Sequence, residues 1–250
     1  MNVVTGASGQ LGSAVVDRLL ERVPAEQIGI SVRDPRKAVG FAERGVRVRR
    51  GDFDDAASLA EAFEDGEQVL LVSASATGEH MGANPASPFA PMPDHATTEV
   101  MLAESGLAFT ALRNGFYTSS GGMLLGQALE TGELAAPADG PVSWTAHDDL
   151  AEAAAIVLTD EGRFEGPTPP LTGSAALDLA ALAAEVLGRP IRRTVLTDAQ
   201  YREALPEHVA EMLLGLFAAS RAGEFAAVDP TLGELLGRPP LTVRDVLAKD

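Results

Sequence analysis

The sequence predicts an α/β fold built on a doubly wound parallel sheet. Short apolar runs alternate with amphipathic segments through the first 75 residues, which is the pattern of successive βα units. A glycine-rich turn, 6–12, joins the first predicted strand to the first predicted helix. The chain has 250 residues, 46% of them apolar, so it can bury a core for such a sheet and for a smaller second region.

Local signals define each element of the first part. Leu11, Val15 and Leu19 recur at helical spacing, Pro35 suits the first turn of a helix, and Gly45 suits its end. We expect strands at 2–5, 28–32, 46–49 and 69–73, and helices at 11–22, 35–43 and 58–63. Right-handed crossovers between these elements then produce two consecutive βαβα halves.

The alternation stops at a stretch rich in glycine and proline, residues 76–93. Proline excludes a regular helix or a central strand there, so we expect an irregular loop with Phe89 and Met92 in a lid. Beyond the loop we expect helices at 95–105, 121–131, 148–158, 178–187, 199–204, 207–219 and 243–247, and strands at 108–112, 142–144, 170–172 and 192–196.

Composition excludes several classes of protein. The net charge of −17 argues against general nucleic-acid binding, and no apolar run approaches the roughly 18 residues that span a membrane. The chain has no cysteine, and its four histidines lack metal-ligand spacing, so we expect no metal site. The first strand begins almost at Met1, so we expect no signal peptide and a cytoplasmic protein.

Charge is distributed unevenly along the chain. The first 50 residues carry nine Lys and Arg against five Asp and Glu, whereas the remaining 200 carry ten against 31. A basic region within an acidic chain indicates that a small anion binds there. We assign that role to Arg33, and we expect Arg44, Arg47, Arg49 and Arg50 to be mainly solvated surface charges.

The glycine-rich turn predicts a site for a diphosphate. Its G-x-x-G-x-x-G spacing differs from the G-x-G-x-x-G of standard dinucleotide sites, but it has the required strand before it and helix after it. Gly6 can take the tight turn, and Gly12 lets the helix approach the strand. Backbone N–H groups at a helix N-terminus favour negative charge. The predicted contacts are Gly6, Ala7, Ser8, Gly9, Gln10 and Leu11.

Arg33 predicts which dinucleotide binds. It lies 21 residues after Gly12, at the end of the second predicted strand. In a Rossmann-type domain an acid at this position binds the ribose 2′-hydroxyl of NAD, and an arginine accommodates the 2′-phosphate of NADP. Arg33 therefore favours NADPH, while Asp34 keeps NADH open as the less favoured cofactor.

Residues that follow the third and fourth predicted strands complete the cofactor site. Asp52 and Phe53 can flank the adenine ring, although Asp52 can also cap the helix that follows. Ser73, Ala74 and Ser75 leave the fourth strand where a ribose or diphosphate would lie. We assign 1–118 with 142–173 to the dinucleotide-binding domain, and 119–141 with 174–250 to a smaller C-terminal substrate-binding subdomain.

Short motifs follow one another in order along nearly the whole chain. They are TGASGQLG at 5–12, SVRDP at 31–35, GDFDD at 51–55, LLVSAS at 70–75, MLAESG at 101–106, LRNGFY at 112–117, LTG at 171–173 and AALAAEVLGRPI at 180–191. The set resembles the NmrA-like family of atypical short-chain dehydrogenase/reductases, and most of all its NADPH-dependent quinone oxidoreductase and triphenylmethane reductase branch. This resemblance implies hydride transfer from NADPH to a quinone or a similar flat acceptor.

The chain departs from the family pattern at two places. A helix and a strand that the family has after the fourth strand are missing, and the unpaired edge leaves room for a homodimer. Val100 stands where the family has a lysine that would hold the nicotinamide ribose. Neither Tyr117 nor Tyr201 is followed by a lysine four residues later, so a tyrosine–lysine acid pair is absent. We therefore assign no catalytic residue.

The resemblance places Asn114, Phe116 and Tyr117 beside the nicotinamide and the acceptor, and we add Trp144 to the predicted substrate contacts. Phe116 and Trp144 can equally be core aromatics. The nicotinamide supplies the chemistry of hydride transfer, so activity can survive without the tyrosine–lysine pair. Two alternatives stay open: a non-catalytic NADP-binding regulator of NmrA type, and a shortened, inactive family member.

Overall fold

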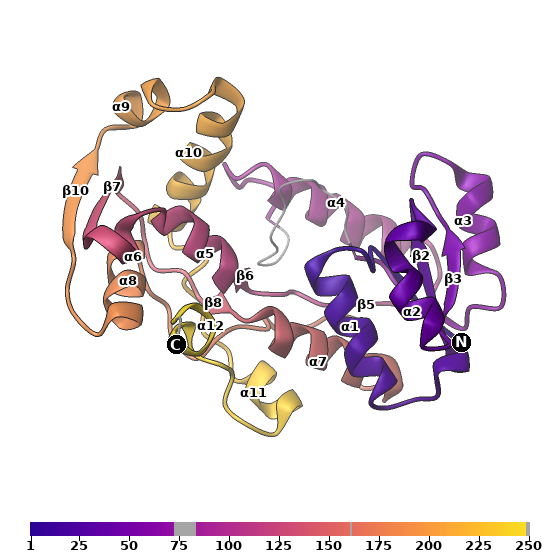
Figure 1. The fold of residues 1–250 in the computed structure, drawn as a ribbon. Coiled ribbons are helices and arrows are strands. Elements are labelled where there is room, and N and C mark those ends of the chain that lie inside the picture. The colour runs from indigo at the N-terminus through magenta and orange to yellow at the C-terminus, as the bar shows by residue number, and fades with distance from the viewer. Residues whose placement is uncertain (73–83, 161, 249–250) are drawn as a thin grey trace. The chain divides into compact units, whose positions relative to one another are not determined.

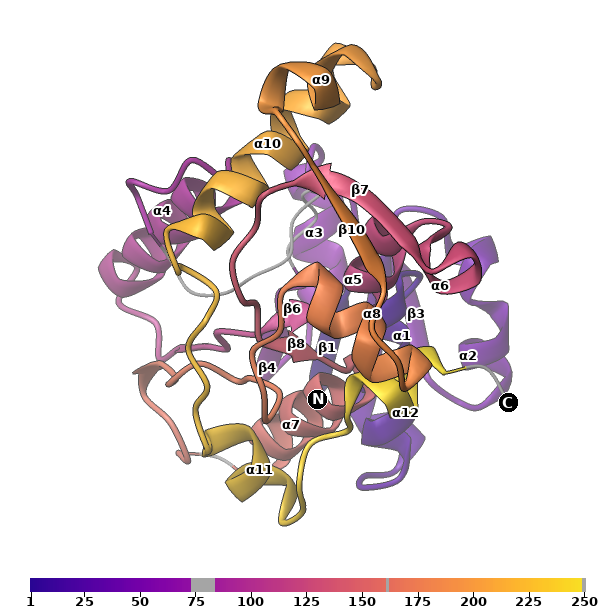
Figure 2. The same cartoon turned by 90° about the vertical axis from the view of Figure 1, so that its left-hand side faces the viewer.

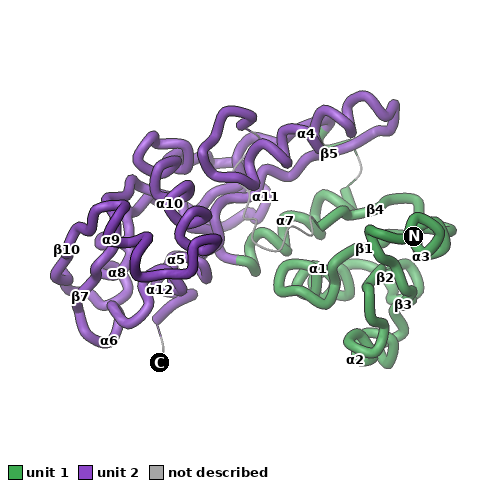
Figure 3. The backbone as a smooth tube through the Cα atoms, turned by 90° about the horizontal axis from the view of Figure 1, so that it is seen from above, with its two compact units in different colours: residues 1–78, 147–164 green, residues 79–146, 165–250 purple. Residues whose placement is uncertain are grey.

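The computed structural model describes residues 1–72, 84–160 and 162–248. The chain divides into two compact units (Figure 3). Unit 1 comprises residues 1–78 and 147–164, and unit 2 comprises residues 79–146 and 165–250. Each unit is compact by itself. The domain boundaries expected from the sequence stay a prediction.

Unit 1 contains a parallel sheet whose four described strands lie in the order β3-β2-β1-β4. In chain order its elements are β1 (Asn2–Thr5), α1 (Gln10–Leu20), η1 (Ala25–Gln27), β2 (Ile28–Val32), η2 (Pro35–Ala38), α2 (Val39–Glu43), β3 (Arg47–Arg50), α3 (Ala56–Phe63), β4 (Gln68–Leu70) and α7 (His147–Thr159) (Figure 1). The chain runs outward from β1 to β3 and returns to the other side of β1 for β4. This order confirms the predicted doubly wound parallel sheet.

The core of unit 1 forms where α1 and α7 pack together (Figure 1). Val15, Val16 and Leu19 recur on one face of α1 and are fully buried, as the helical period requires. The face of α7 is rich in alanine, and small side chains let two helices approach closely. Strands β1 and β2 are buried along most of their length. This packing holds the N-terminal end of α1 beside the sheet.

Unit 2 contains the other helices and three two-stranded parallel pairs among the described residues, β5-β9, β6-β8 and β10-β7. Figure 2 shows β7 and β10 side by side. Its elements are α4 (Pro91–Glu104), β5 (Thr110–Ala111), β6 (Phe116–Tyr117), α5 (Thr118–Leu125), α6 (Ala128–Thr131), β7 (Glu133–Pro137), β8 (Trp144–Thr145), β9 (Gly166–Pro167), α8 (Leu179–Leu187), β10 (Arg192–Leu196), α9 (Asp198–Glu203), α10 (Glu207–Arg221), α11 (Thr231–Leu236) and α12 (Val243–Leu247).

Several elements of unit 2 differ from the expectation. Helix α4 begins at Pro91 instead of residue 95, because a proline in the first helical turn lacks only an N–H that would have no helical partner. The single helix expected at 121–131 is two helices, because Gly126 has a φ of +51° that breaks it. Strands β6, β7 and β9 and helix α11 were not predicted. The strand expected at 170–172 is instead an isolated bridge between Asn114 and Leu171. The strand expected at 69–73 is shorter, because β4 ends at Leu70 and the described residues 71–72 are not strand. The described residues 84–90 of the expected loop hold no helix or strand.

An aromatic cluster forms the core of unit 2. The ring of Phe116 lies 4.8 Å from that of Phe225 and 5.7 Å from that of Phe89, measured between centroids. Phe89 and Met92 are 3% and 1% exposed, so the prediction that they belong to a lid is wrong. Met92 lies in the first turn of α4 and Phe89 lies two residues before the helix, and both side chains belong to the hydrophobic core of unit 2. Among the described residues, no helix has both the length and the apolar character needed to cross a membrane.

Candidate cofactor and substrate site

The turn between β1 and α1 has the backbone that the glycine spacing predicted. Gly6 has a φ of +63°, which favours glycine, and its carbonyl accepts a hydrogen bond of 2.9 Å from the N–H of Gly9. Gly9 is the N-cap of α1 and provides no side-chain cap, and the first turn contains no acidic residue. The first N–H groups of α1 are therefore available to an anion.

Gly12 allows the close approach of helix and strand. A Cβ at this position would lie 2.7 Å from the carbonyl carbon of Gly6 and 2.9 Å from the backbone nitrogen of Ala7. Atoms of a rigid backbone cannot give way at such distances, so glycine is required at this position. The predicted geometric roles of Gly6 and Gly12 agree with the structure, and contact of the turn with a diphosphate stays a prediction.

The end of β4 lies against the same turn. The backbone N–H of Val72 donates a hydrogen bond of 2.8 Å to Oγ1 of Thr5, and a Cβ on Gly6 would be 3.3 Å from Cβ of Val72. The chain therefore leaves β4 beside the glycine turn. The predicted contacts Ser73, Ala74 and Ser75 follow directly but lie outside the described residues.

Arg33 stands directly after β2 and is exposed. In the part of the chain that the structure describes, its guanidinium has no hydrogen-bond or ion-pair partner. An exposed arginine without an internal partner at the end of this strand suits a phosphate ligand.

The other arginines of the basic region are engaged within unit 1. Arg44 contacts Asp17 at 2.5 Å and Arg50 contacts Asp55 at 2.8 Å. Arg47 and Arg49 donate to carbonyl oxygens at the C-terminal end of α3, where a helix favours cations. These side chains are therefore bound within the protein instead of merely solvated, which separates them from Arg33.

Asp52 and Phe53 follow the carboxyl end of β3. The N-cap of α3 is Asp55, which accepts a hydrogen bond of 3.2 Å from the N–H of Ser58, so Asp52 is not the helix cap. Asp52 instead accepts from the N–H of Asp54 and makes an ion pair with the preceding arginine. The side chain of Phe53 is 45% exposed, which leaves a ring face free to stack on a base.

The topology brings the described members of the predicted cofactor site to one edge. The glycine turn follows β1, Arg33 follows β2, and Asp52 follows β3. Because these strands are parallel, their carboxyl ends lie at the same edge of the sheet. In open α/β sheets, ligands bind at this edge, where the strand order reverses, which here is between β1 and β4.

Asn114 is a buried polar residue in unit 2. Its neighbour Gly115 donates a hydrogen bond of 2.8 Å to the carbonyl of Leu171, which holds the segment in place. Asn114 is 7% exposed, and its Oδ1 finds no hydrogen-bond donor among the described residues. Oγ1 of Thr118, a residue that was not predicted from the sequence, is likewise buried without a hydrogen-bond partner among the described residues. Buried oxygens without a donor are costly, so they indicate groups that pair with something else.

Phe116 and Trp144 belong to the core of unit 2. Their rings meet edge to face with centroids 6.0 Å apart, and they are 2% and 3% exposed. Nε1 of Trp144 donates a hydrogen bond of 2.9 Å to the carbonyl of Leu177. This burial supports the core interpretation that the sequence left open, and their contact with a substrate stays a prediction. Tyr117, by contrast, is partly exposed.

We expect Phe116→Leu to lower the free energy of unfolding by about 1–2 kcal/mol, because a smaller apolar side chain leaves part of the aromatic cluster unfilled. Chemical denaturation measures this change. As a core residue, Phe116 should leave the relative rates with a small and a large acceptor unchanged. A variant of normal stability with altered acceptor preference would instead place Phe116 in contact with the substrate.

Helix α4 carries the titratable side chains of Glu99 and His95 and the exposed side chain of Val100. Glu99 makes a bidentate ion pair with Arg113, at 3.1 Å to Nε and 2.8 Å to Nη2, so its carboxylate is not available as a base. Burial lowers the pKa of His95, so the ring is neutral at pH 7 and is not a ready proton donor. The side chain of Val100 is 55% exposed. The Glu99–Arg113 pair was not predicted from the sequence.

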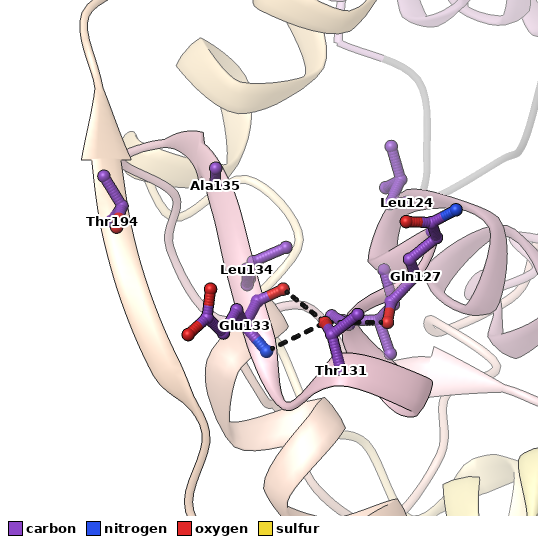
Figure 4. Close-up of a pocket in the computed structure, with 10 residues that line it drawn as sticks. Leu124, Gln127, Thr131, Glu133, Leu134, Ala135 and Thr194 are labelled. Carbon is purple, nitrogen blue, oxygen red and sulfur yellow. Dashed lines mark hydrogen bonds between the residues drawn. The ribbon is translucent and has the colours of Figure 1, made fainter.

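Unit 2 also contains a cavity of about 490 Å³ between α5, α6, β7 and β10 (Figure 4). Leu124 and Leu134 line it with apolar surface, and Gln127, Glu133 and Thr194 provide polar groups. Oγ1 of Thr131 bridges the carbonyl of Gln127 and the N–H of Glu133, at 3.0 and 3.1 Å. None of the predicted substrate contacts lines this cavity.

No group of three or more His, Asp or Glu side chains in the described ranges is arranged to hold a metal ion.

Comparison with known proteins agrees with this fold. A family model described as NAD(P)H-binding matches residues 6–86. Quinone oxidoreductase 2 of Escherichia coli is 33% identical over 98% of this chain and 96% of its own length. An NmrA-like family domain-containing oxidoreductase of Aspergillus flavus is 27% identical over 98% of this chain and 93% of its own.

Solved structures of two related enzymes have the same fold as this chain. The NADPH-dependent quinone oxidoreductase of Escherichia coli in complex with NADPH superimposes with a TM-score of 0.88 at 32% identity, covering 98% of both chains. The triphenylmethane reductase of Citrobacter in complex with NADP(H) has a TM-score of 0.85 at 28% identity, covering 98% of this chain and 99% of its own.

The fold and the glycine turn define an NAD(P)H-binding domain of Rossmann type. The chain belongs to the NmrA-like family of oxidoreductases, in the branch that contains quinone oxidoreductase 2 and triphenylmethane reductase. Its alignment with the Escherichia coli enzyme runs over 277 positions although this chain has 250 residues. That enzyme therefore contains residues without a counterpart here, consistent with the predicted missing helix and strand.

Proposed function

We propose that this protein is an NADPH-dependent reductase that transfers a hydride to a quinone or a similar flat acceptor. The observation that carries the proposal is Arg33, which stands unpaired within the described chain at the position that selects the 2′-phosphate. A relative that is a quinone oxidoreductase aligns with this chain over almost its whole length, which supports the choice of a quinone as acceptor.

Each part of the cofactor would have its own contacts. The N–H groups of the turn, with Gly6, Ala7, Ser8, Gly9, Gln10 and Leu11, would hold the diphosphate. Arg33 would pair with the 2′-phosphate, and the exposed ring of Phe53, beside Asp52, would stack on the adenine. Ser73, Ala74 and Ser75 stay proposed contacts of a ribose or the diphosphate.

When bound, the reduced nicotinamide supplies a hydride, which together with one proton from water converts a quinone to a hydroquinone. The protein's task is then mainly to place the acceptor. Asn114 is a proposed contact because its buried Oδ1 needs a donor that the described residues do not provide. Tyr117 is partly exposed and could stack on a flat ring, and we assign no residue as a catalytic acid.

Titration with NADPH, followed by addition of a benzoquinone, tests the function. We expect saturable quenching of the fluorescence of Trp144 or enhancement of that of NADPH, and then oxidation of one NADPH for each quinone reduced. The absorbance at 340 nm follows the oxidation. Binding of NADPH and NADP⁺ with equal affinity, and no turnover with benzo- or naphthoquinones, would instead identify a non-catalytic regulator. Failure to bind either nucleotide would identify an inactive family member.

One observation favours the regulator as the second candidate. Val100 replaces the lysine that the family resemblance expects beside the nicotinamide ribose, and its apolar side chain offers no hydrogen bond there. A regulator needs to bind the dinucleotide but not to orient the nicotinamide for reaction.

The homodimer and the cytoplasmic location expected from the sequence also stay predictions.

A further inference from the structure

Asp34 poses a problem for a site that takes a 2′-phosphate. It follows Arg33 directly, at the end of β2. A carboxylate here can accept a hydrogen bond from a ribose 2′-hydroxyl and repels a 2′-phosphate, so it favours the cofactor that lacks the phosphate. It is also a near neighbour of Arg33 and an obvious competitor for that guanidinium.

The structure binds this carboxylate to Arg36. Nε of Arg36 lies 2.9 Å from Oδ1 of Asp34, and Nη2 lies 3.0 Å from Oδ2. The backbone N–H of Arg36 also donates to Oδ1, at 3.1 Å, because Asp34 is the N-cap of η2. Both carboxylate oxygens are therefore engaged, and Pro35 between the two residues restricts the backbone that brings them together.

This pairing leaves Arg33 available. Within the described ranges neither Asp34 nor another acid contacts its guanidinium. The side chain of Arg36 is 90% exposed and that of Asp34 is 30% exposed. An exposed ion pair is weak as a rule, but a bidentate geometry that includes a helix cap is the form that persists.

We propose that Arg36 is a positioning residue that determines cofactor specificity: it engages and neutralises Asp34, so that Arg33 can accept a 2′-phosphate. The inference rests on the proposed NADPH-dependent function. Arg36 acts through Asp34 and does not touch the phosphate. The hydrogen bond from Arg36 also holds the pKa of Asp34 below its ordinary value, as expected for a carboxylate that is engaged by this guanidinium.

A double-mutant cycle with calorimetric binding of NADP⁺ and NAD⁺ tests the proposal without turnover. Arg36→Ala should reduce the preference for NADP⁺ over NAD⁺ about tenfold, because an uncompensated carboxylate then faces a doubly charged phosphate. Asp34→Asn should keep or increase the preference. The double variant should match Asp34→Asn within about twofold, since without the carboxylate Arg36 has nothing to neutralise. Arg18→Ala, which breaks the exposed pair with Glu21, is the matched control.

Equal losses from Arg36→Ala in the wild-type and Asp34→Asn backgrounds would overturn the proposal, because they would mean that Arg36 contacts the phosphate itself. An unchanged preference would overturn it as well. The carboxyl pKa of Asp34, followed by NMR, gives a readout without cofactor: it should rise in Arg36→Ala, and a constant value would refute the pair. If the pKa rises in Arg36→Ala but the wild-type protein binds neither nucleotide, the proposed function is refuted, and with it the role of Arg36 in specificity.

Discussion

Replacing Arg33 with alanine should weaken NADPH binding roughly 30- to 100-fold and leave NADH binding almost unchanged. A guanidinium that binds a phosphate through charge-assisted hydrogen bonds contributes a difference of this size. The substitution removes no ion pair within the described protein, so it should not alter the thermal midpoint. Fluorescence titration with the two nucleotides measures the effect.

Arg22→Ala provides the control for this prediction. The side chain of Arg22 is likewise exposed and lacks a partner within the described residues, but it follows the C-terminal end of α1 instead of a strand. We expect its loss to change binding of both nucleotides by less than about twofold, through long-range charge alone. Equal losses of NADPH and NADH affinity in Arg33→Ala would contradict the assignment of the 2′-phosphate to this residue.

Gly12→Ala should be among the most damaging single-methyl changes in unit 1. The added Cβ would lie 2.7 Å from the carbonyl carbon of Gly6, which belongs to a turn that cannot move without shifting β1 or α1. We expect the free energy of unfolding to fall by about 3 kcal/mol, in the upper range for overpacking. NADPH affinity should fall as well, because the N–H groups of the turn move with the backbone. Thermal unfolding and nucleotide titration measure the two effects.

Gly40→Ala is the matched control within the same unit. Gly40 lies in α2, and a Cβ there would meet no atom within 4 Å. Alanine in an exposed helical position should stabilise the protein by about 0.5–1 kcal/mol, through lower backbone entropy in the unfolded chain. A Gly12→Ala variant with the stability and NADPH affinity of the wild type would show that α1 does not approach the turn so closely.

The nucleotide-binding half was largely predictable because its signals are local. The period of apolar residues and the positions of Gly6 and Gly12 follow directly from backbone geometry, and the structure agrees with each. The predicted cofactor contacts lie after consecutive parallel strands, so topology alone brings the described ones to one edge. The prediction that they bind the 2′-phosphate of NADP, by contrast, depends on one residue, Arg33.

Pairing between side chains was much less predictable. The sequence places Asp34 beside both Arg33 and Arg36, and the backbone of η2 decides that Arg36 takes the carboxylate. Burial was also not predictable, because the sequence around Phe89 and Phe116 is the same whether their side chains line a pocket or fill a core. Helix α4 begins early because Pro91 is tolerated in its first turn, although proline usually indicates a break.

The packing of α7 on α1 has a consequence for how the protein is made. The buried face of α1 leaves the ribosome early, but α7, at His147–Thr159, is translated only after the segment 79–146. Synthesis of α1 therefore ends more than a hundred residues before synthesis of its partner helix begins. During that interval the nascent chain exposes an apolar stripe of the kind that chaperones recognise.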